Sequence, residues 1–300
     1  MSENNEQKND SGKKKKSFRN AAAMLLAVGG VWWFNNYTLK TNETSYSSPK
    51  ATSHFRIAVV SDLHAHKYSI SGKNIMRHIV RESPDAVFVL GDMYSRGSSQ
   101  AEKDMAVEAV EDMVKAGYPT YVVSGEHDYD DDYLAAIENT GAKLMNYKCE
   151  YLEINGCKVQ LMGIDNVYYS PTFDLHNEFQ TDEDCFSILL AHIPNYRKFA
   201  EFGADLTLCA DTHGGMVQLP FGLGPAIDPN TGQWFPELHC DSKEVYDKGW
   251  FEYRNGAMFI TSGIGDSPYP VRFNNRPEVV IIDIRPEKVS KSEKGGKNEN

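Results

Sequence analysis

The stretch Leu206-Thr207-Leu208-Cys209-Ala210-Asp211-Thr212-His213-Gly214-Gly215 decides the fold, because an apolar run stops there at an acid, a histidine and two glycines. A short apolar run of this kind is typical of a buried strand, and α/β proteins bind ligands beyond the carboxyl ends of such strands. The paired glycines let the backbone approach a ligand closely. Asp211 and His213 alternate along the chain, so both side chains can point to one side and serve as two ligands of a metal site.

Four earlier apolar runs end in the same kind of signal. The runs 55–60, 85–90, 120–123 and 186–190 are followed by carboxylate or imidazole side chains, in the order Asp62 and His64, Asp92, Glu126 and His127, and His192. Helical spacing of apolar residues at 71–82 and 101–116 separates the first three runs, which predicts βαβ units and a parallel sheet. Parallel strands present their carboxyl ends along one edge, where these side chains would form a two-metal site.

A single Asp or His at a strand end is most often a helix cap or a loop residue, but five consecutive examples are not explained in this way. The remaining histidines fit no such pattern and are interpreted as ordinary: His54, His66, His78, His176 and His239. The sequence has no G-x-S-x-G segment, which argues against a serine hydrolase. The net charge of −11 argues against a nucleic-acid partner, which would need a basic face.

A hairpin is predicted around Asn155-Gly156 in the middle of the chain. A two-residue turn there would place Ile154 opposite Cys157 and Cys149 opposite Met162, which argues against a disulfide between the two cysteines. The chain has five cysteines and no C-x-x-C pair, so a structural zinc knuckle is not expected.

The N-terminal region is typical of a membrane segment. Residues 1–20 are polar and include four consecutive lysines at 13–16, whereas residues 21–39 carry no charge and contain Trp32 and Trp33. This pattern predicts a single-pass anchor at 21–39, with residues 1–20 in the cytoplasm and the folded domain on the outer side of the cell membrane. Secretion after cleavage of a signal peptide is the alternative.

The rest of the chain divides into three parts. Residues 40–54, rich in Ser, Thr and Asn, are expected to form a polar linker, and residues 55–286 a folded domain. Residues 287–300 are charged and are expected to be disordered.

The order Asp-x-His (62–64), Gly-Asp (91–92), Gly-x-His-Asp (125–128), His192 and His213 resembles the motifs of the calcineurin-like metallophosphoesterases. The stretch His213-Gly214-Gly215 and the segment 270–277 are similar to segments of the membrane-associated bacterial branch of this family. The resemblance covers about residues 55–284 and implies an α/β fold, a four-layer α/β/β/α sandwich of two mixed sheets. It also implies that the protein is a metal-dependent phosphoric ester hydrolase.

The resemblance implies two metal sites. The first would use Asp62, His64, Asp92 and His213, and the second would use Asp92, Glu126, His192 and Asp211. His127 would lie beside the scissile phosphate, and Asp128 would orient the imidazole. The implied reaction is hydrolysis of a phosphate ester by a hydroxide that bridges two divalent ions, with His127 stabilising charge or protonating the leaving oxygen.

Two positions depart from the family pattern, which usually has Asn where this chain has Glu126 and His where it has Asp211. Both changes bring a carboxylate to the second metal, so that the carboxylates of Asp62, Asp92, Glu126 and Asp211 would balance the charge of two divalent ions. Such a cluster favours hard ions, Mn²⁺ first, with Mg²⁺, iron or Zn²⁺ as other candidates. The alternative is a catalytically impaired binding or scaffold protein on the same fold.

Two features suggest where a substrate binds. Arg272 and Arg276 could contact a phosphate bidentately, although a structural salt-bridge role is an equally good interpretation. Leu219, Phe221 and Phe235 lie in a long loop after the last metal motif, where they would suit a lipid-like substrate or simply loop packing. We therefore expect the substrate to be a phosphate ester at the membrane or cell envelope, with lipid-linked esters included.

Overall fold

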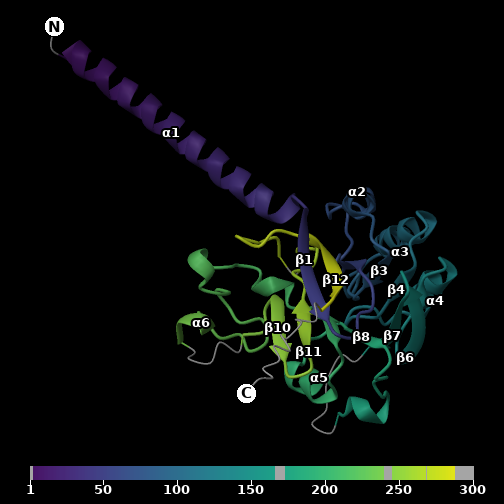
Figure 1. Ribbon diagram of the computed structural model, residues 1–300. Coiled ribbons are helices and arrows are strands. Elements are labelled where there is room, and N and C mark those ends of the chain that lie inside the picture. Colours follow the sequence, from purple (N-terminus) through teal and green to yellow (C-terminus); the bar gives the residue numbers. More distant parts are fainter. Residues whose placement is uncertain (1–2, 166–172, 240–244, 268, 288–300) are drawn as a thin grey trace, which may run out of the picture.

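Two six-stranded mixed sheets form the centre of the protein (Figure 1). The computed structural model describes residues 3–165, 173–239, 245–267 and 269–287. The first sheet has the strand order β1 (Lys40–Ser48), β12 (Glu278–Pro286), β2 (Phe55–Val60), β3 (Ala86–Val89), β4 (Thr120–Val122) and β5 (Lys143–Leu144). All neighbouring pairs in it are parallel except β12 with β2.

The second sheet contains the strand of the opening stretch near its middle. Its order is β10 (Gly249–Tyr253), β11 (Gly256–Ile260), β9 (Leu206–Cys209), β8 (Phe186–Ala191), β7 (Cys157–Ile164) and β6 (Lys148–Ile154). The four central strands are parallel and the two outer strands pair antiparallel. The sequence prediction of parallel strands that end at the candidate ligands is therefore met in both sheets.

Helices cover the outer faces of the two sheets. Ile75 of α2 (Gly72–Glu82) and Val110 of α3 (Gln100–Lys115) share one apolar cluster with strands of the first sheet. Ile137 of α4 (Asp131–Asn139) joins the same cluster, and Phe199 of α5 (Tyr196–Phe202) packs on the second sheet. The remaining short elements are α6 (Pro236–His239) and the 3-10 turns Leu175–Asn177, His213–Gly215 and Pro220–Gly222.

The main core lies between the sheets, because one buried cluster draws side chains from the inner faces of both. Phe55 and Phe88 from the first sheet meet Phe186 and Leu208 from the second in this cluster. Burial of these side chains is the dominant force that holds the layers together. Two mixed sheets with helices outside them were predicted, and this arrangement confirms that architecture.

The hairpin forms with the predicted register, since Ile154 opposes Cys157 and Cys149 opposes Met162. The four cysteines among the described residues are free thiols: Cys149, Cys157, Cys185 and Cys209. Cys240 lies outside the described residues.

The predicted linker over 40–54 is wrong for most of its length. Residues 40–48 form β1, which pairs in parallel with β12 from Lys40 opposite Glu278 to Ser48 opposite Pro286. This strand lies at a sheet edge and keeps most of its side chains partly solvated, so it needs no apolar pattern and resembles a linker in composition. Tyr46 anchors it by stacking on Trp250, with ring centroids 5.4 Å apart.

The N-terminal residues form one long helix, α1 (Glu3–Tyr37), which projects away from the sheets (Figure 1). Within the described residues, no helix combines the length and the apolar character that crossing a membrane requires. The end of α1 is fastened to the domain, because Trp32 Nε1 donates to the Pro270 carbonyl (2.6 Å) and Arg272 N donates to Asn36 Oδ1 (2.8 Å). Of the tail predicted to be disordered, residues 288–300 lie outside the described residues.

Candidate metal centre

The strand ends converge on one site, and the backbone there is strained. Asp62, His64, Asp92, Asp211 and His213 all have positive φ, between 44° and 69°. Non-glycine residues seldom adopt this conformation, which costs of order 1–3 kcal/mol per residue and is typical of functional sites.

Glycines give the carboxylates room. A Cβ on Gly125 would come within 2.2 Å of Asp92 Oδ1, and a Cβ on Gly263 within 2.5 Å of Asp62 Oδ2. The backbone therefore packs directly against the two aspartates that are buried at the centre of the site.

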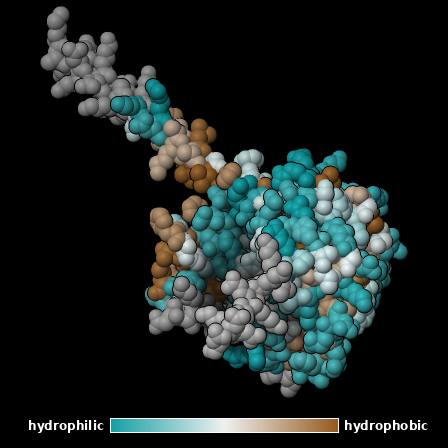
Figure 2. Space-filling view, in the orientation of Figure 1, coloured by the Kyte–Doolittle hydropathy of each residue, from teal (hydrophilic) through white to brown (hydrophobic). Residues whose placement is uncertain are grey.

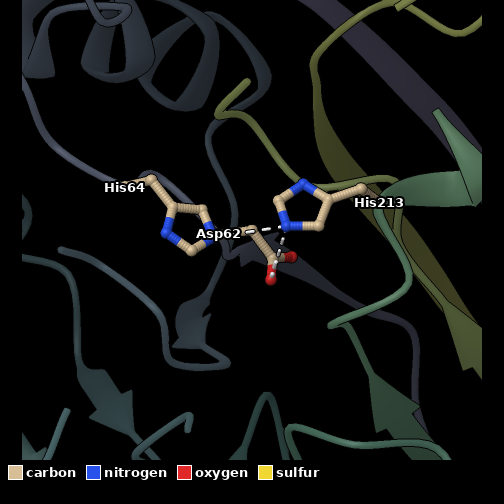
Figure 3. Close-up of side chains that lie close together, drawn as sticks. All are labelled: Asp62, His64 and His213. Atoms are coloured by element: carbon tan, nitrogen blue, oxygen red, sulfur yellow. Dashed lines mark hydrogen bonds and ion pairs between the residues drawn. The ribbon is translucent and has the colours of Figure 1, made fainter. Parts of the chain in front are cut away.

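The first group of candidate ligands consists of Asp62, His64 and His213, whose ligand atoms lie close enough to hold one ion (Figure 3). His213 Nε2 is 3.2 Å from His64 Nε2 and 3.9 Å from Asp62 Oδ1. The sequence predicted these three residues for one metal together with Asp92, whose Oδ2 lies 3.8 Å from His64 Nε2.

The second group consists of Asp62, Asp92 and His192, all buried. His192 Nδ1 donates to the Leu90 carbonyl (2.6 Å), which leaves Nε2 directed at Asp92 Oδ2 (3.3 Å) and Asp62 Oδ1 (3.9 Å). This Nε2 is buried and has no hydrogen-bond partner. A buried imidazole nitrogen that faces two carboxylates can ligate a cation held between them once its proton is displaced, so these residues fit a metal ion.

The electrostatics of the centre also favour bound positive charge. Burial raises the pKa of Asp62 to about 6 and that of Asp211 to about 7, and it lowers the pKa of His64 to about 4. Burial opposes ionisation of Asp92 too, but His192 and His64 outweigh it and lower the Asp92 pKa to about 2. Imidazoles beside buried carboxylates are the donor set of a divalent-metal site.

The two unusual positions lie at the rim. Asp211 Oδ1 is 3.7 Å from His192 Nε2, and Glu126 Oε1 is 3.5 Å from His127 Nε2. Neither joins the three-residue groups found among the described residues, and the Glu126 side chain is 36% exposed. The charge of Glu126 still contributes to the raised pKa of Asp211, after burial and the charge of Asp62.

The sequence model of calcineurin-like phosphoesterases matches residues 55–215, which contain every strand-end motif described above. The chain belongs to the calcineurin-like phosphoesterase family. It is 24% identical over 261 residues to the uncharacterized metallophosphoesterase YkuE of Bacillus subtilis (strain 168), covering 83% of this chain and 86% of YkuE. It is 23% identical over 238 residues to YkoQ of the same organism, covering 75% and 82% of the two chains.

The solved structures similar to this chain include TT1561 of Thermus thermophilus. The two chains are 11% identical and align with a TM-score of 0.45 over 71% of this chain and 91% of TT1561.

His127 is held by a contact that the sequence did not predict. Its Nδ1 accepts a hydrogen bond from the backbone N–H of Arg96 (2.8 Å). Because a backbone N–H can only donate, Nε2 of a neutral His127 carries the ring proton and faces Asp92 Oδ2 at 3.7 Å. His127 also groups with His64 and Asp92 by distance. In this tautomer the proton on its Nε2 suits proton donation.

Asp128 does not orient His127 as predicted. Its Oδ2 accepts from the backbone N–H groups of Asp92 (2.7 Å) and Gly125 (3.0 Å), so it braces the loop that presents Asp92. Burial and the charge of Asp92 raise the pKa of Asp128 to about 7. The sequence places Asp128 beside His127, but the fold turns its carboxylate toward the neighbouring strand end.

The two arginines predicted to contact substrate make protein contacts. Arg272 is buried and donates to the carbonyls of Gly265 (2.8 Å) and Ser262 (2.7 Å). Arg276 donates to the carbonyls of Thr38 (3.1 Å) and Leu39 (3.2 Å) at the end of α1. These hydrogen bonds favour the structural interpretation over bidentate phosphate binding.

A cavity of about 510 Å³ opens beside His64, and its lining includes Tyr37 of α1, Arg96 and Pro270. His66 also lines it and pairs with Asp266, with Nε2 and Oδ1 2.9 Å apart. The sequence interpretation passed over His66, although its alternation with Asp62 and His64 was an available signal. Its partner Asp266 is 200 positions away, so the pair itself could not be predicted.

Proposed function

We propose that this protein is a metal-dependent phosphoesterase that hydrolyses a phosphate ester with two divalent ions at the site formed by the strand ends. The observation that best supports the proposal is His192 Nε2, a buried nitrogen without a hydrogen-bond partner that faces Asp62 and Asp92. Family membership supplies the reaction class.

The residues of the site have two proposed roles, metal binding and proton transfer. Asp62, His64 and His213 would hold one ion, and Asp92, His192 and Asp211 the other, with Glu126 at the rim. Asp92 Oδ2 lies between the two groups, which suits a bridging ligand. Bound divalent ions neutralise phosphoryl oxygens and acidify water. His127, with its proton on Nε2, is positioned to protonate the leaving oxygen, and Arg96 holds it in that tautomer.

The proposed ions are two Mn²⁺, with Mg²⁺, iron or Zn²⁺ as weaker candidates. Four carboxylates supply hard oxygen ligands, and their charges nearly balance those of two bound divalent ions. This preference rests on Glu126 and Asp211, the two carboxylates that depart from the family pattern.

We also propose that the predicted segment 21–39 anchors the protein in the cell membrane through its exposed N-terminal part, with the hydrolase domain outside the cytoplasm. Asn36 and Leu39, at its C-terminal end, pack on the domain instead. The uncharged run and the lysines at 13–16 support this topology. The similarity of segment 270–277 to the membrane-associated bacterial branch also supports it, and secretion after cleavage is the alternative. The proposed substrate is accordingly a phosphate ester of the membrane or envelope, with lipid-linked esters included.

The test is metal analysis of the full chain together with turnover of aryl phosphate mono- and diesters in the presence of Mn²⁺, Mg²⁺, Fe²⁺ or Zn²⁺. We expect two ions per chain, with turnover highest in Mn²⁺. His192→Ala should lose one ion and most activity, whereas His176→Ala, at an exposed histidine paired with Asp174, should lose neither. One ion or none, with no turnover in any metal, would contradict the proposal.

A binding or scaffold role is the second candidate function. Glu126 and Asp211 lie outside the three-residue groups among the described residues, as expected if the second site no longer binds metal tightly. One bound ion or none, without hydrolysis of any ester, would favour this alternative.

A further inference from the structure

Exposed apolar side chains are concentrated on one side of the molecule. Among the described residues, 18 of the 23 exposed large apolar side chains lie in three segments, α1, 221–238 and 269–273. Figure 2 shows brown side chains along α1 and at one edge of the domain, on a face that is otherwise largely teal. We call the part contributed by the domain the apolar edge; it consists of Phe221, Leu223, Ile227, Trp234, Phe235, Leu238, Tyr269, Val271 and Phe273.

The segments of the apolar edge are hydrogen-bonded to one another and to α1. Val217 and Phe273 form a parallel bridge, and Gln218 N donates to the Phe273 carbonyl (3.0 Å). Ile227 and Trp234 form a second bridge within the loop. On the other side, Trp32 Nε1 donates to the Pro270 carbonyl (2.6 Å), so the apolar edge continues into the apolar stretch of α1.

The apolar edge borders the candidate metal centre. Gln218 Nε2 donates to the carbonyl of Gly214 (2.7 Å), next to His213. Val271 and Phe273 flank Arg272, whose guanidinium lies against His213, and Pro270 lines the cavity beside His64. Whatever covers the apolar edge is therefore held close to the entrance of the site.

We propose that the apolar edge docks into the surface of a lipid bilayer next to α1 and holds the cavity beside His64 against the membrane. Its side chains stand at turns: Phe221 has positive φ and is 99% exposed, and Trp234 is 64% exposed. Protruding aromatic and aliphatic side chains of this kind suit the boundary between headgroups and acyl chains, where Trp and Tyr are enriched.

Charge on α1 supports a lipid rather than a protein partner. The four lysines at 13–16 and Arg19 precede the exposed apolar stretch of the same helix, although the chain as a whole carries a net charge of −11. Basic residues next to an apolar, Trp-containing segment attract anionic lipids. Because the apolar edge is fastened to the end of that helix, a bilayer that receives α1 lies within reach of the apolar edge too.

This docking indicates the form of the substrate, a step that rests on the proposed function. A phosphate ester on an amphiphile could place its phosphate in the cavity beside His64 while its apolar part stays in the bilayer. The membrane contact itself needs no hydrolysis, so the two proposals can fail separately.

The test uses the full chain carrying Trp32→Phe and Trp33→Phe. Two tryptophans then remain, Trp234, which is exposed, and Trp250, which is half-buried. Vesicles of phosphatidylcholine and phosphatidylglycerol, with bromine on the acyl chains, should quench the fluorescence of Trp234 on binding. A further Trp234→Phe change should abolish the quenching. Vesicle binding without quenching of Trp234 would overturn the docking, because α1 alone would then hold the chain on the lipid.

A second measurement compares vesicle binding of Phe221→Ser/Trp234→Ser with that of a matched control. The control, Val80→Ser/Tyr151→Ser, removes two exposed apolar side chains elsewhere on the domain. We expect the first variant to partition at least about tenfold more weakly and the control to match the unaltered chain. Equal partitioning of the two variants would count against the docking. So would an unaltered chain that is a dimer and a first variant that is a monomer, because a second copy of the chain would then cover the apolar edge.

Metal content and turnover of a soluble aryl phosphate, measured on the same variants, separate the two proposals. Unchanged turnover with weaker vesicle binding supports both proposals. Quenching of Trp234 fluorescence with no turnover in any form of the chain would contradict the proposed function and leave the docking supported.

Discussion

Nη2 of Arg272 lies 3.3 Å from Nδ1 of His213, and a guanidinium can only donate. Nδ1 is therefore an acceptor, so the ring proton of His213 sits on Nε2 and points to His64 Nε2, 3.2 Å away. His64 Nδ1 in turn lies 2.9 Å from Ser95 Oγ, which completes a chain of four hydrogen-bonded side chains. A metal ion at His213 Nε2 must replace that proton while a buried positive charge faces the other side of the ring.

Arg272→Met should therefore have opposite effects on metal affinity and on stability. Loss of the cation and its hydrogen bond should tighten Mn²⁺ binding about tenfold, since one unit charge at this range is worth of order 1–2 kcal/mol. The substitution also leaves the carbonyls of Ser262 and Gly265 without a donor. This loss should lower the free energy of unfolding by about 3 kcal/mol and Tm by about 10 °C. Calorimetric titration and thermal unfolding measure the two effects, with Arg285→Met, at an exposed arginine, as control. Weaker Mn²⁺ binding by the folded variant would show that Arg272 assists the metal.

Metal binding should weaken as the pH falls from 8 to 6. Burial raises the pKa of Asp211 to about 7, so below that pH a proton occupies the carboxylate and must leave before a cation binds. Burial opposes protonation of His192, but the charges of Asp92 and Asp62 outweigh it and raise the His192 pKa well above its usual value, so its proton is displaced across the whole range. Asp211→Asn should lower the number of protons released below pH 7 by about one.

Proton release can be counted by titrating Mn²⁺ in buffers of different ionisation enthalpy at pH 6, 7 and 8. Asp174→Asn, at an exposed carboxylate paired with His176, is the matched control and should leave the count unchanged. The same count in Asp211→Asn and in the unaltered chain would mean that Asp211 takes no part in binding metal.

The double substitution Glu126→Asn with Asp211→His should raise the use of Zn²⁺ relative to Mn²⁺. It removes two carboxylates from the rim and adds an imidazole, which softens the second site. Turnover and metal content in each ion measure the preference, and the single substitutions show which position matters. A folded double variant with an unaltered preference for Mn²⁺ would remove the support for a retuned second site.

His127→Ala should slow hydrolysis of esters with poor leaving groups more than esters with good ones. A proton from Nε2 matters most when the leaving oxygen is basic, and general acid catalysis contributes about 10²–10⁴-fold. Turnover of an alkyl and of a nitrophenyl phosphate, at unchanged metal content, measures this difference. Equal losses with both esters would assign His127 to charge stabilisation instead, and loss of an ion would make it a ligand.

The sequence by itself determined the features that depend on neighbouring residues. An apolar run that stops at Asp62 or Asp92 indicates both a buried strand and the candidate metal ligand that follows it. Asn155-Gly156 sets the hairpin register, because the two-residue turn fixes which residues oppose each other. The order of the strand-end motifs can likewise be read along the chain, and its resemblance to the family pattern implied two mixed sheets with helices outside.

Only the tertiary structure decided the features that join distant parts of the chain. Strand β1 pairs with β12 from the opposite end of the domain, and its polar side chains give no sign of that partner. Arg272 was predicted for substrate, but the fold buries its guanidinium against His213 and three backbone carbonyls. Asp128 stands next to His127 in sequence, yet it braces Asp92. A side chain's role here depends on which partners packing brings within hydrogen-bond reach, and local pattern does not contain that information.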